Sequence, residues 1–318
     1  MTAPLTLVAG FDTAAKSALI HRWARQRPPG ERWAVVMNGF SPGAPDPSAE
    51  DDVVVFPMVG GCACCAAAVT LRPLLHRILR RGPWHRIVFE LAGSGHLPTL
   101  IDRLREAARG TSLWLDAIVA VVDTGRPGPF LASGVDGAAL ARAQTECADL
   151  VVLTGQQAHT GDASLRTHLA IGLFGPRPVL DDAPSWPEVR RALAEGDPDC
   201  GTARALPGDG RCWTRRHDGA IERIWRWPPQ ICFDRRRVEA WAAQAVQNEA
   251  LRSGIGAFPT LRDWSLWRYA AGHSAWRVCD WRRDARIVCR FEDPPQDGLL
   301  DTLERGLVAA LASDAVGS

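Results

Sequence analysis

Residues 5–17 read Leu-Thr-Leu-Val-Ala-Gly-Phe-Asp-Thr-Ala-Ala-Lys-Ser, and this segment is the most informative about the architecture of the protein. The apolar run Leu5–Ala9 ends at Gly10 and predicts a short buried strand. Residues 14–25 predict a helix, because apolar side chains recur there on one helical face. A strand, a loop that begins with glycine and a helix therefore follow one another directly, and the rest of the chain can be interpreted outward from this unit.

The loop at residues 10–17, called the phosphate loop below, nearly fits the phosphate-binding pattern Gly, four residues, Gly-Lys, then Ser or Thr. Only Ala15 departs from it, and its Cβ crowds space that phosphates need. Amides at the helix start would contact phosphate, Lys16 would neutralise its oxygens and Ser17 would bind Mg²⁺. The predicted nucleotide contacts here are Gly10, Asp12, Thr13, Ala14, Ala15, Lys16 and Ser17. The alternative is an ordinary helix start with a chance Lys-Ser.

Lysine use supports the first interpretation. Lys16 is the one lysine among the 37 basic Lys and Arg residues of the chain. A compact ammonium and a planar guanidinium are not interchangeable beside a phosphate, so a lysine retained among so many arginines favours a functional position.

Strands and helices continue to alternate through the first half of the chain. Further strands are predicted at 32–37, 53–56, 86–90, 117–122 and 150–153, with helices at 70–81, 97–109 and 140–146. Apolar strands that alternate with helices predict an α/β fold with a mostly parallel sheet and helices on both faces, of the P-loop NTPase type.

The second half has a different pattern. We expect a nucleotide-binding domain at residues 1–185, a Pro/Gly-rich linker at 186–212 and a smaller α+β domain at 213–318. Antiparallel strands are predicted at 221–227, 265–270, 275–281 and 286–291, with helices at 234–248 and 297–312. The 13 tryptophans, concentrated in this domain, are expected to pack in its core.

Composition excludes several classes of partner. The net charge of +1 lacks the basic excess typical of nucleic-acid binding, so no nucleic acid is expected. No apolar run reaches the roughly 18 residues that predict a membrane span, so no membrane is expected. The N-terminus lacks the basic and small-residue features of a signal peptide, and we expect a cytoplasmic protein.

Three of the nine cysteines, Cys62, Cys64 and Cys65, lie within four residues. Thiolates are soft ligands suited to zinc or Cu(I), and three of them leave the fourth position of a tetrahedral site open. An open position suits metal transfer. The alternatives to metal binding are that the cysteines form a redox pair or are packed without a function. The other six cysteines are expected to be small buried hydrophobes.

These motifs together resemble the CobW-like branch of the SIMIBI P-loop GTPases, over nearly the whole chain and in the family's order. Gly61-Cys62-Ala63-Cys64-Cys65 matches the family's Gly-Cys-x-Cys-Cys motif completely. Glu90-Leu91-Ala92-Gly93 matches its Glu-x-x-Gly motif, and Gly256–Thr260 resembles a landmark of the CobW C-terminal domain. The resemblance implies Glu90 as a catalytic residue with Lys16, and Gly93 as a contact to the γ-phosphate.

The chain also departs from the family. Thr13 and Ala15 replace loop glycines, and the guanine motif Asn-Lys-x-Asp is replaced by Thr154-Gly155-Gln156-Gln157. Ala15 predicts weakened nucleotide binding because its Cβ crowds the phosphates, and the loss of that carboxylate predicts a relaxed choice between GTP and ATP.

The resemblance implies a GTP-binding protein with Mg²⁺ and Zn²⁺ that delivers metal to a client metalloprotein and hydrolyses GTP slowly. One alternative is a pseudo-GTPase that binds metal without turnover. Another is an unrelated α/β protein with a redox cysteine cluster. His96 is expected to be a packing or surface histidine.

Overall fold

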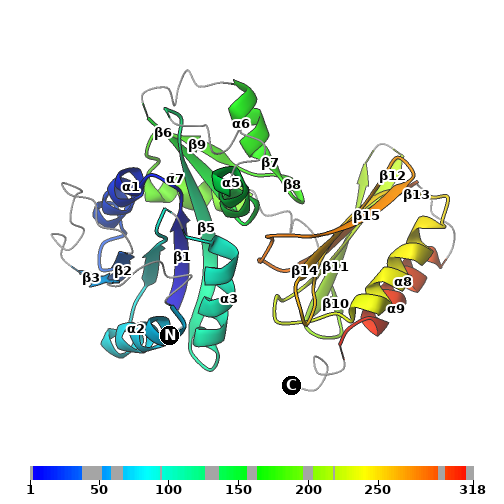
Figure 1. Cartoon of the computed structure of the whole chain (residues 1–318), viewed down its shortest axis with the longest axis horizontal. Helices are drawn as coiled ribbons and strands as arrows, with labels where there is room; N and C mark the ends of the chain where they lie inside the picture. The colour runs from blue at the N-terminus through cyan, green and yellow to red at the C-terminus, as the bar shows by residue number, and fades with distance from the viewer. Residues whose placement is uncertain are drawn as a thin grey trace. The chain divides into compact units, whose positions relative to one another are not determined.

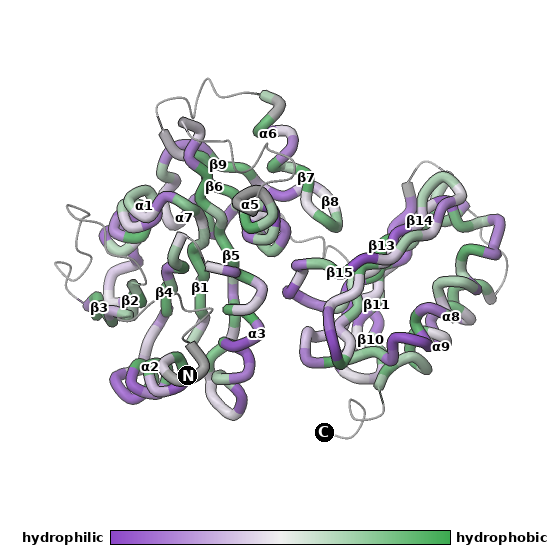
Figure 2. The backbone as a smooth tube through the Cα atoms, in the orientation of Figure 1, coloured by the Kyte–Doolittle hydropathy of each residue, from purple (hydrophilic) through white to green (hydrophobic). Residues whose placement is uncertain are grey.

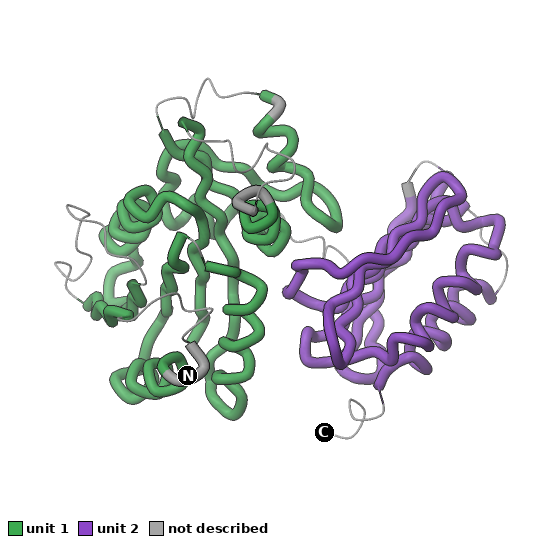
Figure 3. The backbone as a smooth tube through the Cα atoms, viewed as in Figure 1, with its two compact units in different colours: residues 1–197 green, residues 198–318 purple. Residues whose placement is uncertain are grey.

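The structure is a computed structural model that describes residues 3–37, 52–58, 67–93, 95–125, 136–155, 163–195, 203–217, 219–292 and 298–312. The chain divides into two compact units, Met1–Asp197 and Pro198–Ser318 (Figure 3). Among the described residues, no helix is long and apolar enough to span a bilayer.

The first unit contains a wholly parallel seven-stranded sheet in the order β3-β2-β4-β1-β5-β6-β9 (Figure 1). The strands are β1 Ala3–Ala9, β2 Trp33–Met37, β3 Val53–Pro57, β4 Arg86–Glu90, β5 Leu113–Asp123, β6 Leu150–Thr154 and β9 Val179–Asp181. The helices are α1 Thr13–Arg25, α2 Ala67–Arg81, α3 Leu97–Ala108, α5 Asp136–Glu146, α6 Ala163–Ala170 and α7 Trp186–Glu195, and a two-residue hairpin joins β7 Ile171–Gly172 to β8 Gly175–Pro176.

Both faces of this sheet are buried, which explains the unbroken apolar runs of its strands. Leu7 of β1 packs with α2 and α3 on one face, and its neighbour Val8 packs with α1 and α7 on the other. Figure 2 shows the hydrophobic residues along the central strands. The predicted α/β fold with helices on both faces is therefore confirmed.

The second unit is an antiparallel seven-stranded sheet in the order β10-β11-β12-β16-β13-β14-β15. Its strands are β10 Arg204–Leu206, β11 Gly210–His217, β12 Ala220–Trp227, β13 Leu251–Pro259, β14 Trp264–Ala270, β15 His273–Val278 and β16 Ala285–Glu292. Helices α8 Arg235–Val246 and α9 Leu299–Ala309 contribute to its core, together with Trp225, Trp241 and Trp267. The expected packing role of these tryptophans is confirmed.

The sequence predicted most elements of both units and missed several. Helix α7 and strand β10 lie inside the stretch 186–212 that was expected to be a linker, and the division between the two units also falls within that stretch. Strand β13 was also missed because its glycines lower strand propensity. A Cβ at Gly254 would lie 2.5 Å from the Trp267 ring, and one at Gly256 would lie 2.6 Å from the Phe258 ring. The aromatic core of this unit therefore requires those glycines.

The turn from β1 into the phosphate loop depends on Gly10. Its φ is +138°, and a Cβ there would lie 2.2 Å from the carbonyl oxygen of Val121 on β5. Gly30 has a φ of +79°, and a Cβ there would meet nothing within 4 Å.

We expect Gly10→Ala to lower the free energy of unfolding by about 2–4 kcal/mol, because it combines backbone strain with a backbone clash. Gly30→Ala carries the strain alone and should cost about 1 kcal/mol. Urea denaturation of the two variants measures the difference. Equal losses would show that the contact with Val121 is not restrictive.

Candidate functional site

The predicted site lies at the carboxyl ends of two neighbouring strands. Strands β1 and β4 pair in parallel with Val8 opposite Glu90, and α1 begins at Thr13, shortly after β1 ends. Lys16 and Ser17 therefore lie in the first turns of α1, beside the last residue of β4. Ligands of open parallel sheets bind outside the carboxyl ends of the strands.

Lys16 is fully buried, with 0% of its surface exposed. Its ammonium Nζ donates a hydrogen bond of 2.6 Å to the carbonyl oxygen of Gly10. Burial lowers the pKa of Lys16 to about 8, although the carboxylates of Glu90 and Asp12 oppose that shift. The ammonium is thus kept inside the loop where phosphate oxygens were expected.

Glu90 is buried to the same degree and lies against α1. Its Oε1 accepts a hydrogen bond of 3.1 Å from the Ser17 hydroxyl. Its other oxygen, Oε2, is buried and has no hydrogen-bond partner among the residues that the structure describes. Burial raises the pKa of Glu90 to about 7, against the opposing effects of Lys16 and Ser17. A carboxylate oxygen without a partner beside a hydroxyl is an oxygen donor set that fits Mg²⁺.

The start of α1 differs from an open phosphate-binding loop. Asp12 is the N-cap, and its Oδ1 accepts a hydrogen bond of 2.9 Å from the backbone N–H of Ala15. The backbone N–H of Lys16 donates to the carbonyl oxygen of Asp12 at 3.2 Å. Thr13 and Ala15 are helical, and alanine favours a helix by about 1 kcal/mol over the glycine that the family has. One amide expected to bind phosphate is thus bonded to the chain's own carboxylate.

Gly93 permits a close approach between two loops of the site. A Cβ at Gly93 would lie 2.5 Å from the carbonyl oxygen of Phe11 in the phosphate loop. The buried Gln144 of α5 holds the same segment, since its Nε2 donates to the carbonyl oxygens of Gly95 at 3.0 Å and Gly93 at 3.3 Å. The sequence did not predict a role for Gln144, because no local pattern marks a glutamine that lies about fifty residues beyond Gly93 and Gly95 in the chain.

Other predicted residues lie outside this cluster. His96 is the N-cap of α3, where its Nδ1 accepts from the backbone N–H of Thr99 at 3.4 Å, which agrees with a packing or surface role. The metal-motif residues Cys62, Cys64 and Cys65, and Gln156 and Gln157 after β6, lie outside the described residues.

Within the described segments, no group of three or more His, Cys, Asp or Glu side chains is placed to hold a metal. Four of the other cysteines, Cys147, Cys212, Cys279 and Cys289, are buried, and Cys232 is half-buried. These positions agree with the expected packing role.

Comparison with known proteins adds independent information about the first unit. The sequence model of the CobW/HypB/UreG nucleotide-binding domain matches residues 4–169, which is just over half of the 318 residues. A zinc chaperone, YeiR of Escherichia coli strain K12, is 28% identical over 119 residues, which are 37% of this chain and 36% of that protein.

The zinc chaperone CobW of Pseudomonas aeruginosa strain PAO1 is 28% identical over 145 residues, which are 41% of this chain and 37% of that protein. The chain therefore matches little more than a third of the length of either relative.

Two solved structures resemble the whole chain or part of it. The Zn(II)-bound YjiA GTPase from E. coli covers 98% of this chain and 99% of its own, with 16% identity and a TM-score of 0.48. The signal recognition particle 54 kDa protein of Aeropyrum pernix K1, in complex with GDP, covers 62% of this chain and 47% of its own, with 18% identity and a TM-score of 0.37.

The buried carboxyl of Glu90 predicts a pH dependence of stability. Its pKa is raised from 4.5 to about 7 on folding, so its contribution is fully present below pH 4.5 and is lost as pH rises through 7. Glu90→Gln cannot titrate. We expect its unfolding free energy relative to the natural chain to rise by about 1–3 kcal/mol between pH 4.5 and 7.5.

Urea denaturation at several pH values measures this difference. The variant Glu106→Gln, on the outer part of α3, provides the control, and its difference from the natural chain should stay nearly constant. A pH-independent difference for Glu90→Gln would contradict the burial of an ionisable carboxyl at this position.

Proposed function

Because the chain belongs to the CobW/HypB/UreG nucleotide-binding family, we propose that it is a nucleotide-dependent zinc-handling protein. It binds GTP with Mg²⁺ at the site built by Lys16, Ser17 and Glu90, and it carries zinc on the Cys62-Ala63-Cys64-Cys65 motif. Two relatives named as zinc chaperones support the choice of metal. A client metalloprotein then receives the zinc.

One observation carries this proposal: Lys16, Ser17 and Glu90 are all buried at one place, where the Ser17 hydroxyl donates to Glu90 and the charge of Glu90 acts on Lys16. Burying two opposite charges near one another contributes little to stability, because the desolvation of both charges offsets their attraction. Apolar side chains of similar size would serve a core at least as well. The pair is therefore best explained by a charged ligand that it binds.

Each member has a role that its position supports. Lys16 supplies positive charge to the β/γ-phosphates once its ammonium leaves the Gly10 carbonyl. The Ser17 hydroxyl and Glu90 hold Mg²⁺, directly or through water, and the metal supplies further neutralisation of phosphate charge. Where Glu90 acts through water, it also positions the attacking water for slow hydrolysis.

The order of the motifs along the chain couples the two ligands. The three cysteines lie between β3 and α2, and α2 leads directly to β4, which ends at Glu90. Segments that contact the γ-phosphate change their order when it leaves, and the cysteine segment lies in the chain between the phosphate loop and Glu90. Nucleotide state thereby controls how tightly zinc is held.

The N-cap of α1 favours a second candidate, a metal-binding module without nucleotide turnover. The Asp12 carboxylate already accepts from the Ala15 amide, so an incoming phosphate must compete with it. Its negative charge also repels phosphate. If phosphate does not displace the Asp12 carboxylate, the protein binds zinc without control by a nucleotide.

Titrations of the full chain with GTP, with and without Zn²⁺, test the first function. We expect Lys16→Met to lose GTP binding by at least about 100-fold, because no other ammonium replaces it. The zinc affinity of the nucleotide-free protein should be unchanged. Cys62→Ser with Cys64→Ser and Cys65→Ser should lose zinc and still bind GTP.

The variant Arg80→Met, on the exposed side of α2, is the matched control and should change neither affinity. Circular dichroism of each variant shows whether it is folded. Unchanged GTP affinity in folded Lys16→Met would overturn the nucleotide site. Zinc binding without any GTP binding in the natural chain would instead support the second candidate.

Asp12→Asn separates the cap from its charge. Asparagine caps a helix as well as aspartate, so stability should change by less than about 0.5 kcal/mol. Removal of the charge should strengthen GTP binding about 3–10-fold, as judged by the ~1 kcal/mol that a charge contributes at a helix N-terminus.

The same titrations measure this effect, and Asp102→Asn on the exposed side of α3 is the control for a general change in charge. Weaker GTP binding in Asp12→Asn would show that Asp12 assists the nucleotide instead of competing with it.

A further inference from the structure

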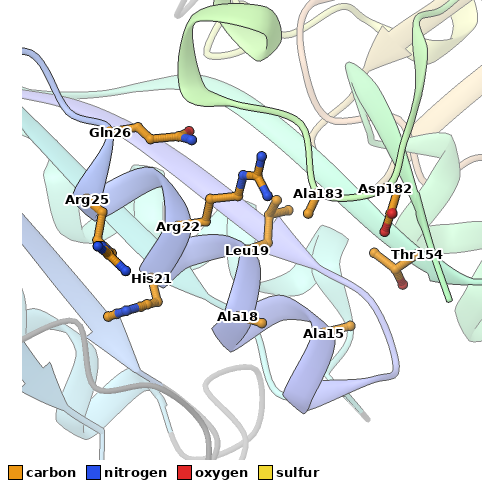
Figure 4. A pocket seen from close by; sticks show the side chains of 10 residues that line it. All are labelled: Ala15, Ala18, Leu19, His21, Arg22, Arg25, Gln26, Thr154, Asp182 and Ala183. Carbon is orange, nitrogen blue, oxygen red and sulfur yellow. The ribbon is translucent and has the colours of Figure 1, made fainter.

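A hollow of about 620 Å³ lies along α1, beside the site already described (Figure 4). Its lining includes Ala15, Leu19 and Arg22 from α1, Thr154 at the end of β6, and Asp182 and Ala183 after β9. Figure 4 shows the side chains of Thr154 and Asp182 on the side of the hollow across from α1. The hollow has room for a nucleoside.

The hollow begins where the phosphate site ends. Ala15 lines it and immediately precedes Lys16 in the same helical turn. Thr154 and Asp182 lie at the carboxyl ends of the parallel strands β6 and β9, on the ligand-binding edge of the sheet. A nucleotide whose phosphates contact Lys16 therefore places its base between α1 and these two strand ends.

The chemistry of the lining suits a purine with two donors on one edge. The apolar side chains of Leu19 and Ala183 can contact the ring faces, and Thr154 and Asp182 provide the polar groups. A carboxylate accepts two hydrogen bonds at once. Guanine offers two adjacent donors, N1–H and the 2-amino group, whereas the corresponding edge of adenine offers one amino donor beside an acceptor.

The position of Asp182 is fixed from several sides. Its backbone N–H donates to the carbonyl oxygen of Leu153 at 2.8 Å. Asp182 and Ala183 have φ of +42° and +52°, a left-handed conformation that non-glycine residues adopt at a cost and that is concentrated at ligand sites. Two residues on, the carbonyl oxygen of Pro184 accepts from Trp23 Nε1 of α1 at 2.9 Å.

Aromatic packing holds the same segment against α1. The Trp186 ring lies 5.4 Å from the ring of Trp23 and 5.2 Å from that of Trp33, between ring centroids. The Gln26 side chain also accepts from the backbone N–H of Trp186 at 3.3 Å. These contacts hold α1 and the segment after β9, which form the two sides of the hollow, in a fixed position relative to one another.

We propose that Asp182 selects the base and makes the site specific for guanine nucleotides. The residues that follow β6, Gly155-Gln156-Gln157, contain no carboxylate, and Asp182 is the carboxylate among the described residues that line the hollow. The inference rests on the proposed function, because it requires phosphates held at Lys16. It replaces the expectation of a relaxed choice between GTP and ATP with a definite preference for GTP.

The substitution Asp182→Asn gives a test with opposite outcomes for two ligands. Its amide donates a hydrogen bond where the carboxylate accepts, which matches xanthine, whose 2-position carries a carbonyl oxygen instead of the amino group. Asparagine tolerates left-handed backbone, so the local conformation is retained. We expect GTP affinity to fall about 10-fold, affinity for xanthosine triphosphate to rise about 10-fold, and ATP affinity to change less than about twofold.

Titrations of the full chain with GTP, ATP, xanthosine triphosphate and inorganic tripolyphosphate measure these changes. The control is Asp209→Asn, an exposed aspartate of the second unit that also has left-handed backbone, with φ of +56°. It should change none of the four affinities. Tripolyphosphate binding should be equal in the natural chain and in Asp182→Asn.

The outcomes separate the two proposals. If Asp182→Asn leaves the ratio of GTP to xanthosine triphosphate affinity unchanged, Asp182 does not read the base, although nucleotide binding stands. If the natural chain binds neither GTP nor tripolyphosphate, the proposed function is wrong, and the role of Asp182 is overturned with it.

Discussion

The structure of the site depends on one electrostatic constraint, the burial of the Lys16 ammonium and the Glu90 carboxylate at one edge of a parallel sheet. Neither charge is solvated there, so each depends on the other and on nearby polar atoms. The geometry of β1 and β4 provides this, because parallel neighbours end at the same edge. Burial moves the two pKa values toward each other, to about 8 for Lys16 and about 7 for Glu90. Small changes in the surrounding charge can therefore change the protonation of the site.

The start of α1 shows how the residues of a loop change an anion site. Helix N-termini attract anions through free amides and the helix dipole. A loop rich in glycine keeps those amides available by delaying the helix, whereas Thr13 and Ala15 let it begin early. The Asp12 carboxylate then occupies one amide as an internal anion. The amide that would bind a phosphate here binds the Asp12 carboxylate, which stabilises the protein without a ligand. The affinity for phosphate is therefore the difference between the amide–phosphate and the amide–carboxylate interactions.

Sequence reasoning found what local patterns encode. Unbroken apolar runs predicted the parallel strands, since both of their faces are buried, and the solitary lysine led to the prediction of a phosphate site at Lys16. Strand β13 was missed because Gly254 and Gly256 serve the aromatic core, which is a tertiary requirement. Gln144 and Asp182 were missed for a related reason. They reach the site only through packing between segments that are distant in the chain, and no local periodicity marks them.

Helix α1 is the element that both ends of the site share. Its first turn carries Ala15 and Lys16, and its buried face carries Trp23, which holds the segment after β9 through Pro184. A ligand that shifts the first turn must therefore also shift the wall that carries Asp182, or strain the tryptophan packing beneath it. Close-packed cores resist continuous deformation. Phosphate binding and base selection are thus coupled through one rigid helix, and the competition at Asp12 bears on both.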